Sequence, residues 1–292
     1  MTIKHIVLSS GSYKGIYMLG VLKELNDIQY YSMDNIESIH AVSVGTIFAV
    51  LLSMRINMEY IIEYVVNRPW EKLFDATTVN IMNVMYSKGL FDINVFYSIF
   101  ENFFKQEKID KNITMKDFHE KYGVENTFLA LNINTFENKI FSHKTTPNVP
   151  IIEAVYMSCS LPFIFAPIKY DGCFYIDGGL INPYPLKMCM EKYNHDEIMS
   201  IFIVDEDFKK NVTDNDNILS YGFFLFNTFI KKNRIKYKVE EFKNEILIPT
   251  TELNAKDAIQ LIQHVGDRKA AIKQGKNYAK LFMRYKLKHK NE

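Results

Sequence analysis

The sequence of 292 residues has few cysteines, almost no net charge and no long uninterrupted apolar segment. Its three cysteines, Cys159, Cys173 and Cys189, are odd in number and lack metal-binding spacing. This argues against a disulfide framework and predicts free thiols in a reducing compartment. The net charge of +1 gives no general attraction to nucleic acid, so nucleic acid is not an expected partner. We therefore expect an intracellular, cytoplasmic protein.

Segments that would cross a membrane or direct secretion are also lacking. The longest apolar runs, near 41–54 and 221–230, are too short and too interrupted for a spanning helix. The first five residues lead directly into an apolar strand, without the features of a signal peptide. Any membrane contact is therefore expected to be peripheral.

The composition fits one α/β domain. With 48% hydrophobic and 24% charged residues, the chain can bury one large core without dividing into domains. Residues 6–8 are typical of a buried strand, and Met18, Val21 and Leu22 have the spacing of the helix that follows. We therefore expect a single domain over residues 1–292.

One stretch, Ala41 to Gly45, has the pattern of a nucleophile elbow. An apolar segment ends at Ser43, small residues lie two positions to either side, and an apolar helical segment follows. The pattern differs by one methyl group from G-x-S-x-G, in which the serine occupies a sharp strand-to-helix turn without room for larger neighbours. The amino end of the following helix would favour developing negative charge. The alternative is a buried strand and helix that contain a serine by chance.

A second stretch, Ser9 to Gly15, lies between the first strand and the first helix and can present backbone N–H groups to an anion. The run Ser10-Gly11-Ser12-Tyr13-Lys14-Gly15 lacks the Gly-Lys-Ser/Thr of a P-loop and two glycines of a dinucleotide-binding loop. The third interpretation is an oxyanion hole for an attack by Ser43.

A third stretch, Asp177-Gly178-Gly179, follows a predicted hairpin whose turn is Asp171-Gly172. An acidic residue at a strand end, followed by two glycines that let the backbone turn sharply, presents a carboxylate at a fixed point. An ordinary Asx turn is the alternative.

Together the three stretches resemble the patatin-like phospholipase family. Its members carry a G-x-G-x-x-G loop, often with Lys or Arg at the fifth position, then the G-x-S-x-G elbow, then Asp-Gly-Gly or Asp-Gly-Ala. The corresponding residues here are 10–15, 41–45 and 177–179. A Ser-x-Ser-Leu-Pro segment within 154–167 and Gly89-Leu90-Phe91-Asp92 extend the likeness over most of the first 190 residues. The resemblance implies a three-layer α/β fold with a central, mostly parallel sheet flanked by helices.

The resemblance also implies a serine acyl-ester hydrolase of the phospholipase A or lysophospholipase type that acts on membrane glycerophospholipids through an acyl-enzyme. Ser43 would be the nucleophile and Asp177 its base, and the N–H groups of Ser10, Gly11 and Ser12 would form the oxyanion hole. The other motif residues would support the site, with Lys14 steadying the loop: Lys14, Gly15, Ala41, Gly45, Gly178 and Gly179. No metal or other cofactor is expected.

Three positions depart from the family's glycines: Ser10, Ser12 and Ala41. A serine keeps the backbone N–H group, but here it must adopt backbone angles that glycine adopts more readily. A catalytically weak or inactive lipid-binding or scaffold protein on the same fold is therefore the alternative function.

An α/β-hydrolase with a Ser-acid-His triad is a further alternative, and His195 and His264 are its candidate histidines because they lie downstream of Ser43. That fold places several strands before its elbow, whereas Ser43 follows what is only the second predicted strand. His195 lies in a turn-like string and His264 in a helical segment, and we expect both at the surface or on a helix face.

Residues of about 55–123 are predicted to form a helical, aromatic-rich insertion, in which Asn57 and Thr114 begin helices. The insertion is either a helical layer packed over the sheet or an acyl-chain channel or lid. Strands are expected at 127–134 and 139–142, with the turn between them at Glu137-Asn138.

Two basic segments have two interpretations each. Residues 219–238 combine aromatic residues with a basic cluster, which indicates an interfacial helix or a core helix with a solvated end. The basic C-terminal helix, about 254–292, is a solvated tail or a contact for anionic lipid. The expected partners are thus a phospholipid or other acyl-ester lipid as substrate and, transiently, a membrane surface.

Overall fold

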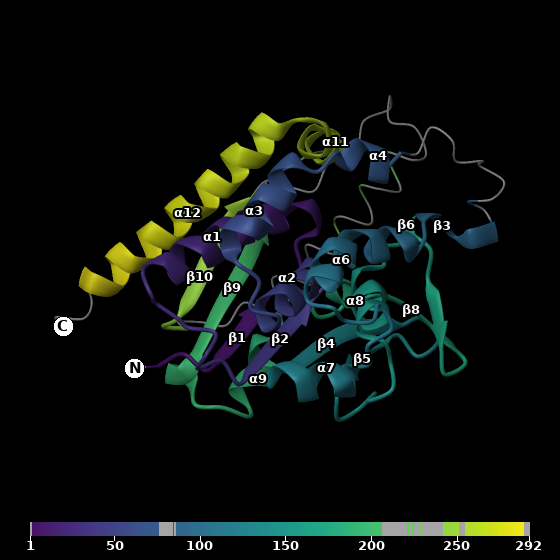
Figure 1. The fold of residues 1–292 in the computed structure, drawn as a ribbon, viewed down its shortest axis with the longest axis horizontal. Coiled ribbons are helices and arrows are strands. Elements are labelled where there is room, and N and C mark those ends of the chain that lie inside the picture. The colour runs from purple at the N-terminus through teal and green to yellow at the C-terminus, as the bar shows by residue number, and fades with distance from the viewer. Residues whose placement is uncertain are drawn as a thin grey trace.

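The computed structural model describes residues 2–75, 86–205, 242–250 and 255–288, and residues 84, 221, 224 and 228 besides. Its strands are β1 (His5–Leu8), β2 (Ser38–Val42), β3 (Gly89–Phe91), β4 (Glu125–Asn132), β5 (Glu137–Phe141), β6 (Phe163–Phe165), β7 (Ile168–Tyr170), β8 (Cys173–Asp177), β9 (Ile198–Asp205) and β10 (Glu245–Thr250) (Figure 1). Its α-helices are α1 (Gly15–Asp27), α2 (Val44–Ser53), α3 (Met58–Asn67), α4 (Trp70–Leu73), α6 (Asn94–Gln106), α7 (Met115–Tyr122), α8 (Ile151–Cys159), α9 (Leu186–Met190), α11 (Ala255–Gln263) and α12 (Val265–Lys288). The short 3₁₀ helices among the described residues are η1 (Ser12–Lys14), η2 (Gly178–Leu180) and η3 (His195–Glu197).

An eight-stranded sheet forms the centre of the fold (Figure 1). Its strands are ordered β10-β9-β1-β2-β4-β8-β7, and β5 pairs with β4. The strands from β10 to β4 are parallel, whereas β5, β7 and β8 pair in antiparallel fashion. The prediction of a mostly parallel sheet flanked by helices is confirmed. A separate pair, β3 and β6, is also parallel.

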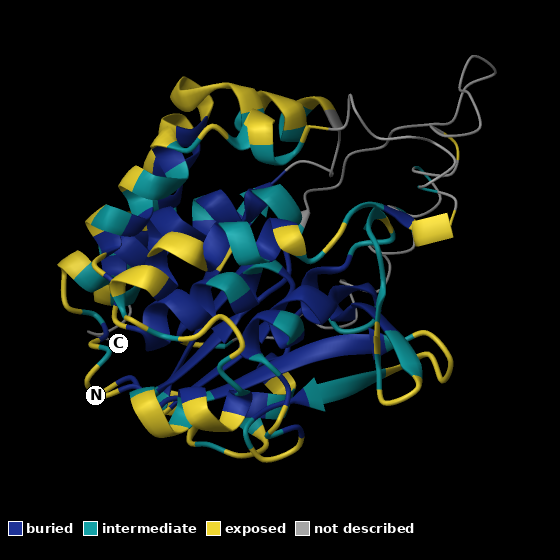
Figure 2. Ribbon diagram, turned by 45° about the vertical axis from the view of Figure 1, so that its right-hand side comes forward, coloured by how far each residue is buried: buried dark blue, intermediate teal, exposed yellow. Residues whose placement is uncertain are grey.

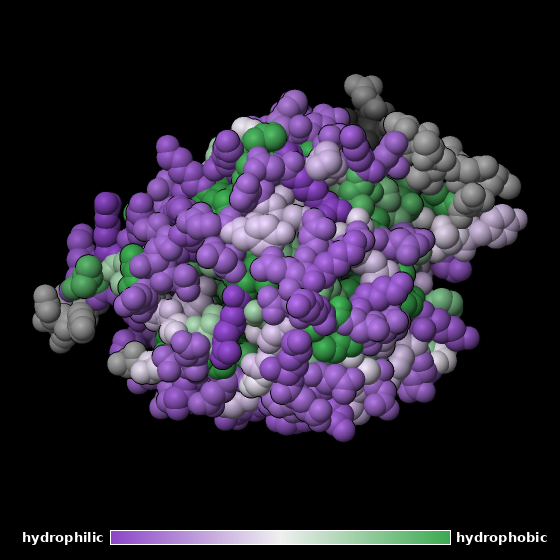
Figure 3. Space-filling view, in the orientation of Figure 1, coloured by the Kyte–Doolittle hydropathy of each residue, from purple (hydrophilic) through white to green (hydrophobic). Residues whose placement is uncertain are grey.

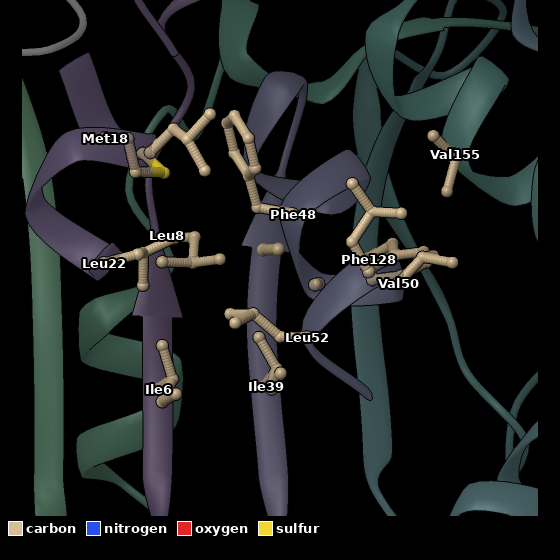
Figure 4. Packing of buried hydrophobic residues seen from close by; sticks show 14 of the residues in the cluster. Ile6, Leu8, Met18, Leu22, Ile39, Phe48, Val50, Leu52, Phe128 and Val155 are labelled. Carbon is tan, nitrogen blue, oxygen red and sulfur yellow. The ribbon is translucent and has the colours of Figure 1, made fainter. Parts of the chain in front are cut away.

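The two faces of the sheet are covered by different helices. Ile6 and Leu8 of β1 and Ile39 of β2 pack with apolar residues of α1, α2 and α8 in the main core (Figure 4). Val7 belongs to a smaller cluster that includes Leu186 of α9. Removal of apolar surface from water, worth about 25 cal/mol per Å², holds these layers together. The sheet and α2 are mostly buried, and exposed residues gather on the outer helices (Figure 2).

The long C-terminal helix α12 lies directly against α1 (Figure 1). The two helices touch at glycines, because a Cβ on Gly275 would lie 2.0 Å from the Tyr17 oxygen and one on Gly20 would lie 2.1 Å from the Ile272 oxygen. Only glycine permits so close an approach of two backbones. Buried Arg268 of α12 donates hydrogen bonds to carbonyl groups near the ends of α3 and α11. The C-terminal helix is therefore an integral part of the fold.

The aromatic-rich segment predicted at 55–123 includes α3, α4, α6 and α7. Phe96, Phe100, Phe103 and Phe104 of α6 are buried in the main core. Their burial favours the interpretation of this segment as a packed layer. On the face seen in Figure 3, hydrophilic side chains cover most of the surface and apolar ones form small patches.

Local sequence signals predicted several features correctly. The side chains of Asn57 and Thr114 accept backbone N–H bonds at the first turns of α3 and α7. Both residues of Asp171-Gly172 have positive φ, as a type I′ turn between β7 and β8 requires. The three cysteines are free thiols. The cytoplasmic location inferred from them stays a prediction.

One turn was placed wrongly. Glu137 and Asn138 already belong to β5, where they pair with Asn132 and Leu131. The chain reverses just before them, and Phe136 has a φ of 60°. Cross-strand pairing with β4 thus outweighs the turn preference of Asn138.

The C-terminal region also differs from its prediction. The single helix expected over about 254–292 is two helices, α11 and α12, with His264 between them. The predicted interfacial segment 219–238 lies outside the described residues, apart from 221, 224 and 228. Among the helices that are described, none combines the length and the apolar character needed to cross a membrane.

Candidate active site

Ser43 lies at a sharp turn between β2 and α2, as the elbow pattern predicts. Its backbone angles, φ 55° and ψ −134°, lie in a region that residues with a side chain seldom adopt. The Ser43 hydroxyl donates a hydrogen bond of 2.6 Å to Asp177 Oδ2, across 134 positions of the chain. Both residues are buried. The turn therefore aims the hydroxyl at one oxygen of a carboxylate that is largely shielded from solvent.

The small residues on either side of Ser43 have different surroundings. A Cβ on Gly45 would lie 2.7 Å from the Leu8 oxygen and 2.9 Å from the Ser9 oxygen. Glycine therefore lets α2 begin directly against the end of β1. Ala41 is completely buried in β2, between β1 and β4, where its methyl group is accommodated.

Asp177 ends β8 and is held in place by backbone groups. Its N–H donates to the Ser160 oxygen at 3.0 Å, and its Oδ1 accepts the Gly179 N–H at 2.7 Å. A Cβ on Gly178 would lie 2.4 Å from a carbonyl oxygen of β4. The two glycines thus let the chain turn beneath the carboxylate, with Oδ1 anchored and Oδ2 directed toward Ser43.

The N–H groups of the loop before α1 are used in two ways. The Ser10 N–H donates to the Pro183 oxygen at 2.8 Å, so it is not available to an oxyanion. This narrows the predicted donors to Gly11 and Ser12, whose N–H groups have no acceptor among the residues that the structure describes. Ser12 has a φ of 51°, a left-handed conformation that glycine adopts more readily.

This loop lies directly beside the other two stretches. A Cβ on Gly179 would lie 2.7 Å from the Ser10 Cβ. A Cβ on Gly15 would lie 2.4 Å from a methyl group of Val44, the residue after Ser43. The fold therefore brings all three predicted stretches together at one end of the parallel strands.

Lys14 is buried although it carries a charge. Its ammonium group donates to Thr250 Oγ1 at 3.1 Å, and the Thr250 hydroxyl donates to the Val204 oxygen at 3.2 Å. These bonds tie the loop to the ends of β9 and β10. They favour the predicted steadying role of Lys14 over direct contact with a lipid phosphate.

Two ionisable groups near the site stay neutral at physiological pH. Burial, and then the Asp177 carboxylate, raise the pKa of the Cys159 thiol well above its usual value, so Cys159 does not compete as a nucleophile. Burial lowers the pKa of His40 in β2 to about 3, and the charge of Lys192 acts in the same direction. Neither a thiolate nor an imidazolium therefore adds charge beside the elbow.

The two histidines considered for a triad lie elsewhere. His195 is exposed in η3, and His264 is exposed at the break between α11 and α12. In the described parts of the chain, neither one hydrogen-bonds to Ser43 or Asp177. The prediction that both lie at the surface is confirmed.

A cavity of about 540 Å³ is lined by residues of α3, α4 and α6. Its lining includes Glu63, Arg68, Lys72 and Asn102, and none of the motif residues. The lining also includes Tyr60, Tyr64 and Leu73, so it mixes polar and apolar side chains. The predicted acyl-chain channel or lid in the insertion stays a prediction.

Sequence reasoning missed two contacts that one segment makes with the site. The Ser-x-Ser-Leu-Pro segment places Ser158 against the Ser43 N–H and the Ser160 carbonyl against the Asp177 N–H. The pattern marks this segment, but no spacing in the sequence indicates which groups its serines contact.

Known proteins are similar to this chain in sequence and in fold. Residues 6–190, more than half of the chain, match the family model described as patatin-like phospholipase. The "Probable lipid hydrolase 463L" of Invertebrate iridescent virus 6 is 29% identical over 257 residues, which cover 86% of this chain and 80% of that protein. The "Uncharacterized protein R571" of Acanthamoeba polyphaga mimivirus is 29% identical over 186 residues, 64% of this chain and 61% of that protein.

Among solved structures, VipD from Legionella pneumophila is similar to this chain with a TM-score of 0.58. The sequences are 15% identical, and the superposition covers 98% of this chain and 67% of that one. At this identity the likeness concerns the fold alone. The family model, in contrast, spans all three motifs and the strands that carry them. The chain therefore belongs to the patatin-like phospholipase family.

Proposed function

We propose that the protein is a serine acyl-ester hydrolase of membrane glycerophospholipids, of the phospholipase A or lysophospholipase type. That it is a lipid hydrolase follows from its family, and the relative named as a probable lipid hydrolase agrees. The finer proposal depends on one observation, the hydrogen bond of 2.6 Å from Ser43 Oγ to Asp177 Oδ2. This contact is the arrangement that a nucleophile and its base require.

In the acylation step, Asp177 accepts the hydroxyl proton while Ser43 Oγ forms a bond to the ester carbonyl carbon. Because the Gly179 N–H holds Oδ1 at 2.7 Å, Oδ2 already faces the proton that it would take. When the tetrahedral intermediate collapses, the bond from the carbonyl carbon to the leaving oxygen breaks. The proton then passes from Asp177 to that oxygen, which leaves as an alcohol.

Negative charge that develops on the ester oxygen needs nearby donors. The N–H groups of Gly11 and Ser12 are the proposed donors. The Ser43 N–H is not a donor to the ester oxygen, because Ser158 Oγ accepts it at 2.9 Å. The amino end of the ten-residue helix α2 adds positive potential at the same place.

Deacylation uses water in place of the alcohol. Asp177 accepts a proton from water, the water oxygen bonds to the acyl carbon, and Ser43 leaves and regains a proton. An ester suits this site, because its alkoxide leaves more readily than an amide nitrogen and makes less demand on a histidine acid. The exposed positions of His195 and His264 are consistent with this scheme.

The test is to incubate the purified protein with mixed phospholipids and to identify the products by mass spectrometry. Ser43→Ala and Asp177→Asn are each expected to lower kcat by about 10⁴-fold or more while the protein stays folded. Ser53→Ala is the matched control, because Ser53 is a buried serine that hydrogen-bonds to Asn126. Full activity in Asp177→Asn would contradict the dyad.

A catalytically weak or inactive lipid-binding protein on the same fold is the second candidate. The observation behind it is the φ of 51° at Ser12, where the family motif has glycine. A fluorophosphonate probe separates the two candidates. Labelling of the native protein but not of Ser43→Ala supports the hydrolase, whereas lipid binding without labelling supports the alternative.

We also propose that the C-terminal end of α12 contacts anionic lipid. The last turns of this helix combine exposed apolar and basic side chains: Leu281, Tyr285, Leu287, Lys280, Arg284 and Lys288. This combination is typical of helices that lie on a membrane surface.

The proposed lipid contact and the reaction would lie at opposite ends of the sheet. Lys286 of α12 donates to Asn244, which immediately precedes β10, whereas Ser43 follows the carboxyl end of the parallel strand β2. The proposed contact would thus anchor the protein without covering Ser43. Flotation with liposomes tests it, since equal flotation with and without acidic lipid would contradict it.

A further inference from the structure

We propose that Ser158 is a positioning residue that keeps the nucleophile elbow in its reactive geometry, an inference that rests on the proposed function of Ser43. Ser158 lies near the end of α8 and is completely buried. Its hydroxyl oxygen accepts the Ser43 N–H at 2.9 Å, and its own O–H donates to the Leu129 oxygen at 2.6 Å. The second bond orients the hydroxyl so that a lone pair faces Ser43.

The contact acts on a strained part of the backbone. Backbone angles that residues with a side chain seldom adopt are strained, and they persist only where the surrounding structure holds them. Ser43 has such angles, with φ 55° and ψ −134°. A hydrogen bond to this N–H adds stability, and a buried N–H left without a partner costs more than the bond itself contributes. The bond to Ser158 therefore helps to hold the Ser43 backbone in its strained conformation.

The same end of α8 also reaches the proposed base. The Ser160 carbonyl accepts the Asp177 N–H at 3.0 Å. The Leu129 oxygen, to which Ser158 donates, would lie 2.4 Å from a Cβ on Gly178. One helix end thus contacts the backbone of both reacting residues, and it sets the position of Ser43 Oγ relative to Asp177 Oδ2.

This arrangement predicts an effect on turnover and little effect on substrate binding. Ser158 uses its hydroxyl on Ser43 and Leu129, so its influence on the reaction passes through the alignment of Ser43. A small misplacement of a nucleophile slows the chemical step, and about 1 Å can lower the rate about 100-fold. The affinity for substrate depends on other groups and should change little.

The experiment measures kcat and KM with p-nitrophenyl butyrate, together with melting temperatures. Ser158→Ala is expected to lower kcat about 10- to 100-fold at nearly constant KM. Ser158→Thr keeps the hydroxyl and is expected to recover part of the loss. Ser53→Ala, which removes another buried and hydrogen-bonded serine hydroxyl, should lower the melting temperature similarly and keep the native kcat.

A kcat of Ser158→Ala equal to that of Ser53→Ala would overturn the inference, and so would a kcat that only follows the melting temperature across the variants. If Ser158→Ala does not fold, Ser158→Cys replaces it, because a thiol is a weak acceptor and the same loss of kcat is expected. Ser43→Ala is measured alongside. Turnover that survives Ser43→Ala overturns the proposed function itself, whereas turnover lost in Ser43→Ala and unchanged in Ser158→Ala overturns only the role of Ser158.

Discussion

Acid is expected to destabilise this protein through one buried histidine. His40 is completely buried in β2, and burial lowers its pKa to about 3, with Lys192 acting in the same direction. In the unfolded chain the imidazole returns to its ordinary pKa of about 6.5. Between these two values the unfolded chain binds a proton that the folded chain does not. The contribution of neutral His40 is therefore complete above pH 6.5 and is lost as the pH falls toward 3.

The size of the effect follows from the difference between the two pKa values. Each pH unit in this window changes the free energy of unfolding by about 1.4 kcal/mol. Between pH 7.5 and pH 4.5, His40 should therefore lower the free energy of unfolding by about 2.6 kcal/mol, nearly all of it below pH 6.5. The charge of Glu125 opposes the lowered pKa, and the charges of His5 and Lys144 add to it.

Urea denaturation at the two pH values isolates this contribution when the native protein is compared with His40→Leu. Neither ring nitrogen of His40 has a hydrogen-bond partner among the described residues, so leucine removes the titrating group without breaking a bond described there. From pH 7.5 to pH 4.5, the free energy of unfolding of the native protein should fall by about 2.6 kcal/mol more than that of His40→Leu. His195→Leu, at an exposed position, is the control and should behave as the native protein does. Equal losses in the native protein and His40→Leu would refute the reasoning.

Three further changes test other parts of the structure by chemical denaturation. Ser12→Gly should raise the free energy of unfolding by up to about 1 kcal/mol, because Ser12 has a φ of 51°; a loss of stability would contradict the strain. Gly275→Ala should lower the free energy of unfolding by about 1–3 kcal/mol, because the new Cβ would lie 2.0 Å from a backbone oxygen of α1. Gly266→Ala is the control and should not lower this free energy, because the space around Gly266 is open. Thr250→Val removes the hydroxyl that accepts a hydrogen bond from Lys14 and should lower the free energy of unfolding by about 1.5–3 kcal/mol. An unchanged free energy would contradict a steadying role for this contact.

The sequence is informative where a residue's conformation is dictated by its immediate neighbours. Ser43 is an example, because the small residues beside it and the apolar segments on either side are needed by any serine at a sharp strand-to-helix turn. Asp177-Gly178-Gly179 is another, because two glycines after a strand allow a turn that fixes a carboxylate. These local requirements are readable in the chain, and the structure brings the two side chains together.

The sequence is uninformative where a group's role depends on its direction in space. Ser10 and Ser12 stand in the same motif, yet the Ser10 N–H is bound to Pro183 and the Ser12 N–H has no acceptor in the described part of the chain. Similarly, Lys14 meets Thr250 across 236 positions, and no local pattern indicates that pair. Such contacts follow from the order of the strands, which is settled only when the whole sheet forms.

The contacts around Ser43 fix the geometry of the site. The hydroxyl lies 2.6 Å from Asp177 Oδ2, and the bonds that hold the two residues come from strands and helices. A site held in this way has little reorganisation left to complete at the moment of reaction, which is the condition under which fixed donors lower a barrier most. Under the proposed function, the steps open to regulation are access of lipid to Ser43 and delivery of the protein to a membrane surface. Variants of the exposed C-terminal end of α12 should accordingly alter activity on vesicles and leave turnover of a small soluble ester unchanged, and an equal loss on both substrates would place α12 in the reaction itself.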